Sequence, residues 1–246
     1  MTGTAAPLLR TEGLCKAYRR RTVVDEVEVQ VGAAEFVGLL GPNGAGKTTT
    51  FRMCMGMVRP DRGRIFFHGQ EITELAIYQR ARLGLGYLAQ EPSVFRRLSV
   101  EANVLAVLEI QGVRGPERRS RCAELLEELG LSHLRESLGE VLSGGERRRL
   151  EIARVLAGRP SLILLDEPFS GVDPIAVEEI QEILAGLKLK GIAVLLTDHN
   201  VRETLHITDR AYILAQGKVL AEGTPEQLVK DETVRRVYLG KRFELA

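Results

Sequence analysis

The sequence has 246 residues, 44% of them hydrophobic, which is enough to bury one large core. Its 34 Lys and Arg residues balance 33 Asp and Glu residues, so the net charge of +1 disfavours nucleic acid and anionic lipid as direct partners. The first ten residues lack the features of a signal peptide, and no apolar run is long enough to cross a bilayer. We expect a single domain, residues 1–246, that reaches a membrane only through partners.

Short basic runs and three cysteines are the minor features of the composition. We expect the basic runs on solvated faces of helices or loops. Because the cysteine number is odd and the spacing suits no metal, we expect reduced thiols in a cytoplasmic protein. The runs are residues 19–21, 118–119 and 147–149, and the cysteines are Cys15, Cys54 and Cys122.

Two kinds of strand are predicted along the chain. Residues 27–31 alternate between apolar and polar side chains, as in a half-solvated antiparallel strand. Residues 35–40, 162–165 and 192–196 are short apolar runs, typical of parallel strands covered on both faces. The sequence therefore predicts an α/β fold with a mainly parallel core sheet and an antiparallel N-terminal sheet.

Helices dominate two stretches of the sequence. At about residues 91–142 we expect an inserted helical subdomain, in which Leu125 and Leu126 share one face of a helix that ends at Gly130. Residues 224–246 are predicted to form a C-terminal helical appendage, because they begin with a helix cap, a proline and a capping-box glutamine.

Residues 41–48 match the phosphate-loop pattern GxxxxGK[ST] between an apolar strand and a helix that begins near Lys47. Glycines let backbone amides turn toward a β-phosphate, Lys47 reaches the β and γ oxygens, and Thr48 offers a hydroxyl to Mg²⁺. The loop predicts a nucleotide site with bound magnesium. Its predicted nucleotide-binding residues are Gly41, Pro42, Asn43, Gly44, Ala45, Gly46, Lys47, Thr48 and Thr49.

A buried strand at residues 162–165 is followed by two carboxylates, Asp166 and Glu167. Ligands of doubly wound sheets bind at the carboxyl ends of strands. Asp166 is therefore predicted to face the metal, and Glu167 to lie near the γ-phosphate as the base that orients and deprotonates the attacking water.

Ser143, Gly144 and Gly145 form a second anion-binding helix start, which has no lysine and no adjoining apolar strand. Two phosphate-binding elements with one lysine have two explanations. Either two phosphates bind separately, or the second element completes the site of another molecule.

In their order, these motifs resemble those of the ABC transporter ATPases over nearly the whole chain. They are the phosphate loop, Gln90, LSGGE at 142–146, LILLDEP at 162–168, SGVD at 170–173 and His199. The resemblance implies ATP and Mg²⁺ as ligands, with Gln90 touching the metal and the attacking water. It also implies that Tyr18 stacks on adenine, and that His199 holds the γ-phosphate and helps to position Glu167.

The same resemblance implies a head-to-tail pair of chains. Ser143, Gly144 and Gly145 would bind the γ-phosphate held by the partner chain, and Asp173 would cross the contact. The second of the two explanations above is thereby favoured.

Four further segments resemble the ATP-binding subunits of lipopolysaccharide exporters, namely residues 95–100, 143–149, 197–204 and 237–240. This implies a homodimer on the cytoplasmic face of the inner membrane, docked under two membrane subunits and powering lipopolysaccharide extraction. Phe95, Arg96 and Arg97 are the predicted rim of the groove for those subunits. Ala89 departs from the proline expected there, which affects the rigidity of the Gln90 loop and not its chemistry.

Three other classes of protein compete with this interpretation. ATPases of branched-chain amino acid importers share much of the pattern. Soluble ABC ATPases that act on nucleic acid or the ribosome usually carry a long coiled coil or two ATPase halves, and this sequence has neither. P-loop kinases and GTPases need neither LSGGE nor a late histidine.

Overall fold

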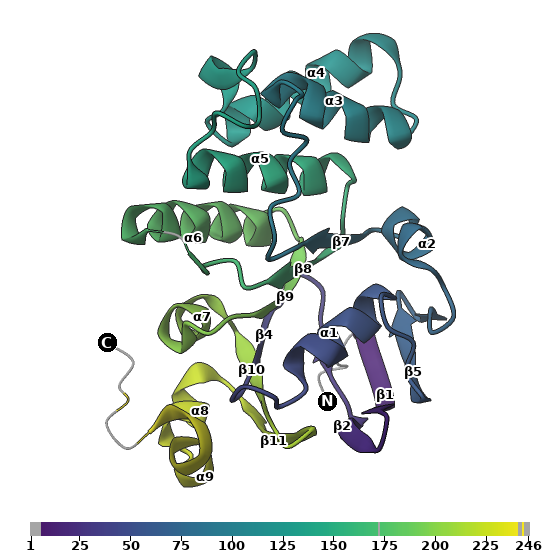
Figure 1. The fold of residues 1–246 in the computed structure, drawn as a ribbon, viewed down its shortest axis with the longest axis vertical. Helices are drawn as coiled ribbons and strands as arrows, with labels where there is room; N and C mark the ends of the chain where they lie inside the picture. Colours follow the sequence, from purple (N-terminus) through teal and green to yellow (C-terminus); the bar gives the residue numbers. More distant parts are fainter. Residues whose placement is uncertain (1–5, 172, 241–242, 244–246) are drawn as a thin grey trace.

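The structure is a computed structural model that describes residues 6–171, 173–240 and 243. Its strands form two sheets (Figure 1). A layer of helices lies at the top of Figure 1, the larger sheet runs through the middle, and the smaller sheet lies at the lower right. The predicted α/β fold, with a mainly parallel core sheet and an antiparallel N-terminal sheet, is confirmed.

The core sheet has six strands in the order β11-β10-β4-β9-β8-β7. Neighbouring strands from β10 to β7 pair in parallel, and β11 pairs antiparallel at one edge. The three predicted parallel strands are β4, β8 and β9, and all lie inside this sheet. The strands are β4 (Phe36–Leu40), β7 (Leu85–Leu88), β8 (Leu162–Asp166), β9 (Ala193–Thr197), β10 (Arg210–Ala215) and β11 (Lys218–Gly223).

The smaller sheet is antiparallel throughout. One continuous strand at residues 27–31 was the wrong prediction, because β2 ends at Val27 and β3 begins only at Gln30. Between them Thr11 of β1 bonds to the chain on both sides: its hydroxyl donates to the Val27 carbonyl at 3.3 Å and accepts the Val29 N–H at 2.8 Å, and its own N–H donates to the Val29 carbonyl at 2.9 Å. The strands are β1 (Leu9–Tyr18), β2 (Arg21–Val27), β3 (Gln30–Val31), β5 (Arg62–Phe67) and β6 (Gln70–Glu71).

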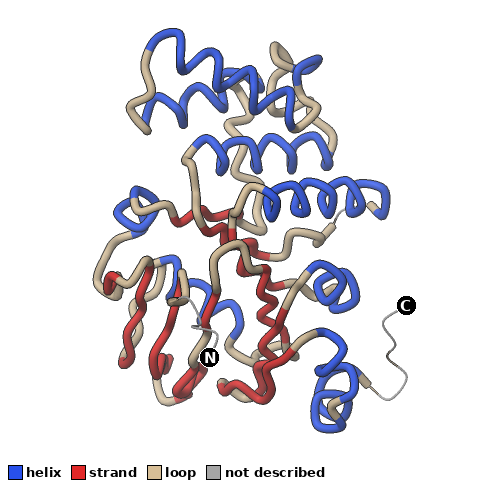
Figure 2. Tube along the Cα trace, turned by 180° about the vertical axis from the view of Figure 1, so that it is seen from behind, coloured by secondary structure: helices blue, strands red, loops and turns tan. Residues whose placement is uncertain are grey.

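Helices cover both faces of the core sheet (Figures 1 and 2). α4 carries buried Leu125 and Leu126 on one face, as predicted. α3, α4 and α5 pack on one another, so the helical layer extends beyond residue 142 to the end of α5. The helices are α1 (Lys47–Met55), α2 (Ile77–Arg82), α3 (Val100–Ile110), α4 (Gly115–Glu128), η1 (Ser132–Leu134), α5 (Gly144–Ala157), α6 (Pro174–Leu189), α7 (Val201–Ile207), α8 (Pro225–Lys230), α9 (Glu232–Val234) and η2 (Arg235–Leu239).

Alternate residues of the parallel strands enter different cores, as two-sided burial requires. Phe36 of β4 and Val194 of β9 join a core with the helical layer. Their chain neighbours Val37 and Leu195 join a second core with α1 and the N-terminal sheet. The core sheet is thus held between two apolar layers, and its carboxyl edge remains open to ligands.

The C-terminal helices begin as predicted, with Thr224 capping α8 and Gln227 completing the capping box. Val172, in the predicted contact loop at 170–173, lies outside the described residues, as do residues 241–242 and 244–246 of the predicted appendage. The division into subdomain and appendage remains our interpretation.

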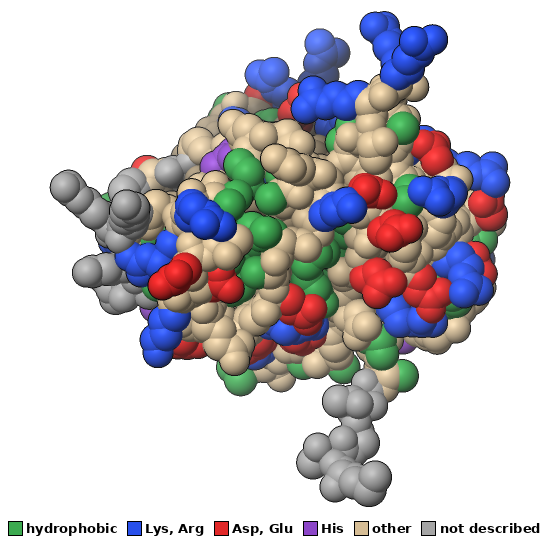
Figure 3. Space-filling view, turned by 90° about the horizontal axis from the view of Figure 1, so that it is seen from below, with side chains coloured by type: hydrophobic (Ala, Val, Ile, Leu, Met, Phe, Trp, Pro, Cys, Tyr) green, Lys and Arg blue, Asp and Glu red, His purple; other side chains and the backbone are tan. Residues whose placement is uncertain are grey.

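The structure agrees with the expectation of free thiols and corrects the expectation for one of the basic runs. All three cysteines are buried free thiols, and burial raises the pKa of Cys54 to about 12. The basic run 147–149 is not a solvated face, because Arg148 is buried and Arg149 pairs with Glu179 at 2.6 Å. On the face seen in Figure 3, basic and acidic side chains are interspersed.

Within the described ranges, no helix has both the length and the apolar character needed to cross a bilayer.

Candidate active site

The phosphate loop joins β4 to α1 at the open edge of the core sheet, and two of its glycines have no room for a side chain. Gly41 has a φ of 144°, and a Cβ added to it would lie 2.1 Å from the Leu214 carbonyl oxygen. Gly46 has a φ of 102°, and its Cβ would lie 2.6 Å from the Val23 carbonyl oxygen. Only glycine fits both the backbone conformation and the packing at these positions.

The loop encloses a cavity of about 320 Å³ at the N-terminus of α1. No side chain caps this helix start, so its first-turn amides and the positive end of its dipole remain available to an anion. Val23 was not among the predicted site residues, and the alternation of β2 offered no functional signal for it. The cavity is lined by Val23, Asn43, Gly44, Ala45, Gly46, Lys47, Thr48, Thr49, Glu167 and His199.

Lys47 is buried at this cavity, with its ammonium bound to the loop itself. It donates to the Gly41 carbonyl at 2.6 Å and to the Pro42 carbonyl at 3.1 Å. Burial lowers the pKa of Lys47, and the negative charge of Glu167 opposes that shift. A phosphate oxygen would offer this ammonium a charged acceptor in place of two neutral carbonyls.

Glu167 lines the cavity, and both of its carboxylate oxygens have partners. Gln90 donates to one oxygen at 2.6 Å, and His199 Nε2 lies 2.7 Å from the other. The backbone of Glu167 has a φ of 49°, and its N–H donates to the Thr197 carbonyl at 2.7 Å. Because non-glycine residues rarely adopt positive φ, this conformation costs backbone free energy. It turns the chain out of the direction of β8 at the residue that carries the carboxylate.

Asp166 is the buried neighbour of Glu167 at the end of β8. Burial and the charge of Glu167 raise the pKa of Asp166. The hydroxyl of Tyr87 donates to it at 3.4 Å, and burial raises the pKa of Tyr87 to about 12. Sequence reasoning missed Tyr87, whose only signal was its place in the short apolar stretch before Gln90.

The donors present fit a magnesium ion that arrives with a triphosphate. Thr48, Gln90 and Asp166 all offer oxygen, the ligand atom that Mg²⁺ prefers. In the described part of the chain, no group of three or more His, Cys, Asp and Glu side chains could hold a metal on its own. Magnesium commonly takes one or two protein ligands and completes its shell with phosphate oxygens and water, so this sparse set suits it.

The Gln90 loop is tied to α5 on both sides of Gln90. Arg148 donates to the Ala89 carbonyl at 2.9 Å, and Glu151 accepts the Ser93 N–H at 2.6 Å. Arg148 and Glu151 pair with each other at 3.1 Å while both are buried. Two opposite charges three residues apart on the helix are the sequence signal for this pair, and the prediction of a solvated basic run at residues 147–149 left Glu151 out of account.

The second anion-binding element forms the start of α5. Ser143 accepts the Glu146 N–H at 3.3 Å, and Glu146 accepts the Ser143 N–H at 2.8 Å, so a capping box is present. Gly144 and Gly145 line a second cavity of about 180 Å³, and Glu167 lines both this cavity and that of the phosphate loop. All three residues of the element, 143–145, are described, and none of them lines the cavity of the phosphate loop.

Two other predicted residues are not among those that line the phosphate-loop cavity. Tyr18, at the end of β1, is 47% exposed, with the Lys16 ammonium 5.8 Å from its ring centre. Asp173 is exposed and lines the smaller cavity. The roles predicted for both side chains, adenine stacking and a contact between chains, remain predictions.

A phosphate loop and paired carboxylates at the carboxyl edge of a mainly parallel sheet define a P-loop nucleoside triphosphatase. The family profile described as ABC transporter matches residues 24–170, and one described as branched-chain amino acid ATP-binding cassette transporter matches residues 218–244. This chain therefore belongs to the ABC transporter family, as one of its ATP-binding and ATP-hydrolysing subunits.

Relatives match the chain nearly end to end. The lipopolysaccharide export system ATP-binding protein LptB of Acidithiobacillus ferridurans is 60% identical, with 97% of this chain and 99% of that protein covered. The protein of the same name from Escherichia coli K12 is 54% identical, covering 96% and 99%. Among solved structures, the ADP conformation of an ABC transporter ATP-binding cassette has a TM-score of 0.85 at 29% identity, covering 96% and 100%.

Proposed function

We propose that this ATPase hydrolyses Mg-ATP in the cavity of the phosphate loop, with Glu167 as the base. The single observation that carries this proposal is the Glu167 carboxylate, held by Gln90 and His199 at a cavity that also contains Lys47. A carboxylate fixed by two partners is aimed before substrate arrives, which suits the orientation of one water molecule.

The residues divide the work of phosphoryl transfer. Lys47 and the first amides of α1 bind the phosphates, and His199 holds the γ-phosphate side of the cavity. Glu167 accepts the proton of the attacking water. Magnesium, held by Thr48, Gln90 and Asp166, would neutralise charge on the phosphate oxygens.

We further propose that two chains pair head to tail, so that residues 143–145 of one chain complete the γ-phosphate site of the other. Support comes from their absence from the phosphate-loop cavity of their own chain. A solved structure described as the dimeric post-hydrolysis state of an ATP-binding cassette bound to ADP and Pi has a TM-score of 0.78 at 25% identity, covering 88% of this chain and 98% of that one.

Two inactive variants test the shared site. Lys47→Ala disables the phosphate loop and Ser143→Arg disables the second element, so each variant alone should lose hydrolysis. In a mixed head-to-tail pair, both defects fall in one site and the other site is intact. Mixing the two variants should therefore restore hydrolysis, at most to about a quarter of wild-type turnover, because about half of the pairs are mixed. No recovery in pairs verified to be mixed would contradict the model.

The transported substrate is proposed from the relatives, whose printed name is lipopolysaccharide export system ATP-binding protein. We propose that this chain powers lipopolysaccharide export as a homodimer beneath two membrane subunits, on the cytoplasmic face of the inner membrane. The importer alternative is less well supported, because its profile covers only residues 218–244.

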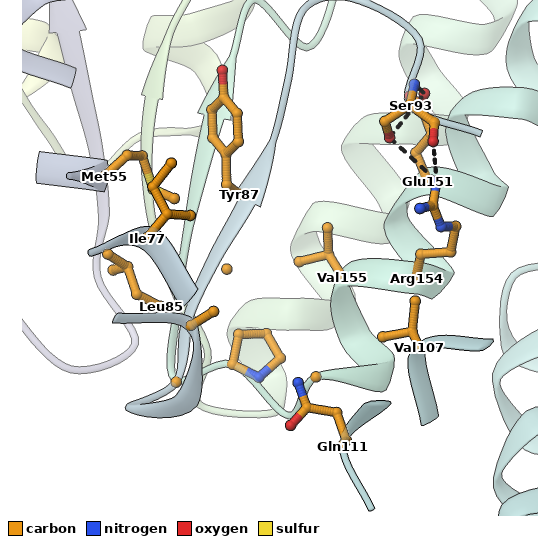
Figure 4. A pocket seen from close by; sticks show the side chains of 15 residues that line it. Met55, Ile77, Leu85, Tyr87, Ser93, Val107, Gln111, Glu151, Arg154 and Val155 are labelled. Carbon is orange, nitrogen blue, oxygen red and sulfur yellow. Dashed lines mark hydrogen bonds between the residues drawn. The ribbon is translucent and has the colours of Figure 1, made fainter. Parts of the chain in front are cut away.

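A groove suits docking of the membrane subunits. A cavity of about 340 Å³ lies between β7, α2 and α5, lined mainly by apolar side chains such as Ile77 and Val155 (Figure 4). Arg154 lines it and stacks 4.4 Å from the ring centre of Phe95, which is 45% exposed. We propose that Phe95, Arg96 and Arg97 contact a partner helix there, since an apolar groove with a polar rim fits an amphipathic helix.

The cargo proposal is tested by purifying the chain with its membrane subunits and by following lipopolysaccharide in cells depleted of the chain. We expect lipopolysaccharide to accumulate in the inner membrane, and wild-type but not Lys47→Ala chain to restore its export. Co-purification with amino acid permeases, with lipopolysaccharide distributed normally, would favour the importer instead.

A further inference from the structure

The segments that carry Glu167 and His199 leave the core sheet next to each other. β8 and β9 pair in parallel, with Asp166 opposite Thr197 at their carboxyl ends (Figure 1). Glu167 follows β8 directly, and its N–H donates to the Thr197 carbonyl at 2.7 Å. His199 follows β9 after one intervening residue, Asp198. The two segments therefore start side by side, and the Asp198 side chain lies where they leave the sheet.

The Asp198 carboxylate bonds to both segments. One oxygen, Oδ2, accepts the Phe169 N–H at 2.9 Å, two residues after Glu167. The other oxygen, Oδ1, accepts the Asn200 N–H at 2.8 Å, one residue after His199. The first bond joins residues 29 positions apart, and the second closes a local turn around His199. A single side chain thus fastens the segment after Glu167 to the turn that carries His199.

Burial makes these two bonds strong. Asp198 is 2% exposed, and moving a carboxylate from water into the interior costs free energy unless hydrogen bonds replace the lost hydration. Bonds to an ionised acceptor are also about twice as strong as bonds between neutral groups. Phe169 is itself buried in the core of the helical layer, so the donor is held as firmly as the acceptor. The link between the two segments is therefore rigid.

His199 depends on the backbone that carries it. Its side chain is 58% exposed, and its Nε2 lies 2.7 Å from a carboxylate oxygen of Glu167. An exposed ring is little constrained by packing, so its position follows that of the turn at residues 198–200. A displacement of this turn relative to the segment after Glu167 would separate the two side chains.

We propose that Asp198 is a positioning residue for ATP hydrolysis, which holds the Glu167 segment and the His199 turn at a fixed distance. Asp198 does not line the phosphate-loop cavity, and it acts through the backbone N–H groups of Phe169 and Asn200. The inference rests on the proposed function, in which Glu167 is the base. Because small displacements of reacting groups greatly reduce rates, a fixed distance favours hydrolysis.

Asp198→Asn and Asp198→Ser are the direct tests. In Asp198→Asn the amide group faces one of the two N–H groups, and in Asp198→Ser the hydroxyl can keep the local turn but is too short to reach Phe169. We expect kcat of the purified full chain to fall about ten- to hundredfold in both variants. The Kd for Mg-ADP should change less than about twofold, because the phosphate loop and Lys47 are untouched.

Amide hydrogen exchange, followed residue by residue with NMR, measures the link itself. In Asp198→Ser the Phe169 N–H should exchange at least about fivefold faster than in wild type, because its acceptor is lost. The Asn200 N–H, whose local turn remains, should change less. The N–H of Leu164, inside β8, should not change.

Leu205→Ala is the control for stability. Leu205 is buried on α7, in a third apolar core that also contains Leu40 and Ile213, and it takes part in neither bond of Asp198. Truncation of this side chain should lower Tm but leave kcat and the exchange of the Phe169 N–H unchanged.

The possible results separate this role from the proposed function. Wild-type kcat in both Asp198 variants would overturn the positioning role. A loss of Mg-ADP affinity equal to the loss of kcat would also overturn it, as would a loss of kcat that Leu205→Ala reproduces. Normal hydrolysis by Glu167→Gln would instead refute the proposed base. The exchange of the Phe169 N–H does not depend on that base, and an unchanged rate in Asp198→Ser would overturn the link.

Discussion

Two helix starts in this protein carry the signature of anion binding, and the structure treats them differently. α1 begins at the phosphate loop without a side-chain cap, and Lys47 and Glu167 lie at the same cavity. α5 begins with a capping box in which Ser143 and Glu146 bind each other's backbone. The first backbone amides of α1 are therefore open to a phosphate, whereas a first-turn amide of α5 is already bonded to the Ser143 side chain.

The difference shows which features make a phosphate site complete. Both starts have glycines and a helix dipole, and Glu167 lines the cavities at both, but only the α1 start has the Lys47 ammonium beside it. Helix amides alone give modest anion affinity, whereas charged donors in a water-poor cavity give much more. The start of α5 is thus suited to completing a site whose other parts come from another molecule.

The largest effect is expected from Glu167→Gln, which tests whether ATP is hydrolysed at the cavity beside α1 with Glu167 as the base. Loss of the base should lower turnover by at least about 100-fold, while ATP binding is retained because the amide keeps the shape of the side chain. Single-turnover hydrolysis and equilibrium binding of ATP measure the two effects. Normal hydrolysis by this variant would remove Glu167 from the role of base.

Lys47→Ala and Ser143→Arg compare the two starts directly. Lys47→Ala should weaken ATP binding to single chains at least tenfold, because a charged donor to the phosphates is lost. Ser143→Arg should leave the affinity of single chains unchanged and affect only paired chains. Titration at protein concentrations too low for pairing distinguishes the two variants, and equal losses would end the contrast between the two helix starts.

Arg80 tests how firmly α1 is anchored at its far end. This buried guanidinium donates to the Met53 carbonyl at 2.8 Å and to the Cys54 carbonyl at 2.7 Å, in the last turn of α1. Arg80→Met leaves these carbonyls without that donor, so the free energy of unfolding should fall by about 3 kcal/mol. Denaturant unfolding measures the loss. Arg82→Met, a neighbouring substitution on the same helix, is the control and should cost far less.

The smallest effect is expected from Glu146→Gln in the capping box of α5. Hydrogen bonds from the Ser143 backbone and side chain lower the pKa of Glu146 in the folded chain. Its stabilising contribution is therefore present above the unfolded pKa and is lost as pH falls through the folded pKa. At about pH 7 the Tm of Glu146→Gln should be slightly below that of wild type. This difference in Tm should disappear as the pH falls toward about pH 3. A gap independent of pH would contradict this account.

The local elements of the fold could be predicted from the sequence for local reasons. Apolar runs of five residues, a cap at Thr224 and a glycine pattern before Lys47 each depend on neighbours in the chain. The strand at residues 27–31 was predicted too long, because the Thr11 hydroxyl that interrupts it comes from another strand. The burial of Arg148 was missed because the Ala89 carbonyl, to which it donates, comes from a distant segment, although Glu151 three residues later on the same helix was a local signal.

By itself, the sequence determined the phosphate loop at residues 41–48, because those spacings fix the local backbone conformation and place the amides and Lys47 within one turn. Only the tertiary structure decided which distant groups share that site. It brought Gln90, Glu167 and His199 together, and it kept residues 143–145 out of the lining of the phosphate-loop cavity. Contacts between segments far apart in the chain depend on how sheets and helices pack, so the spacing of residues within one segment does not predict them.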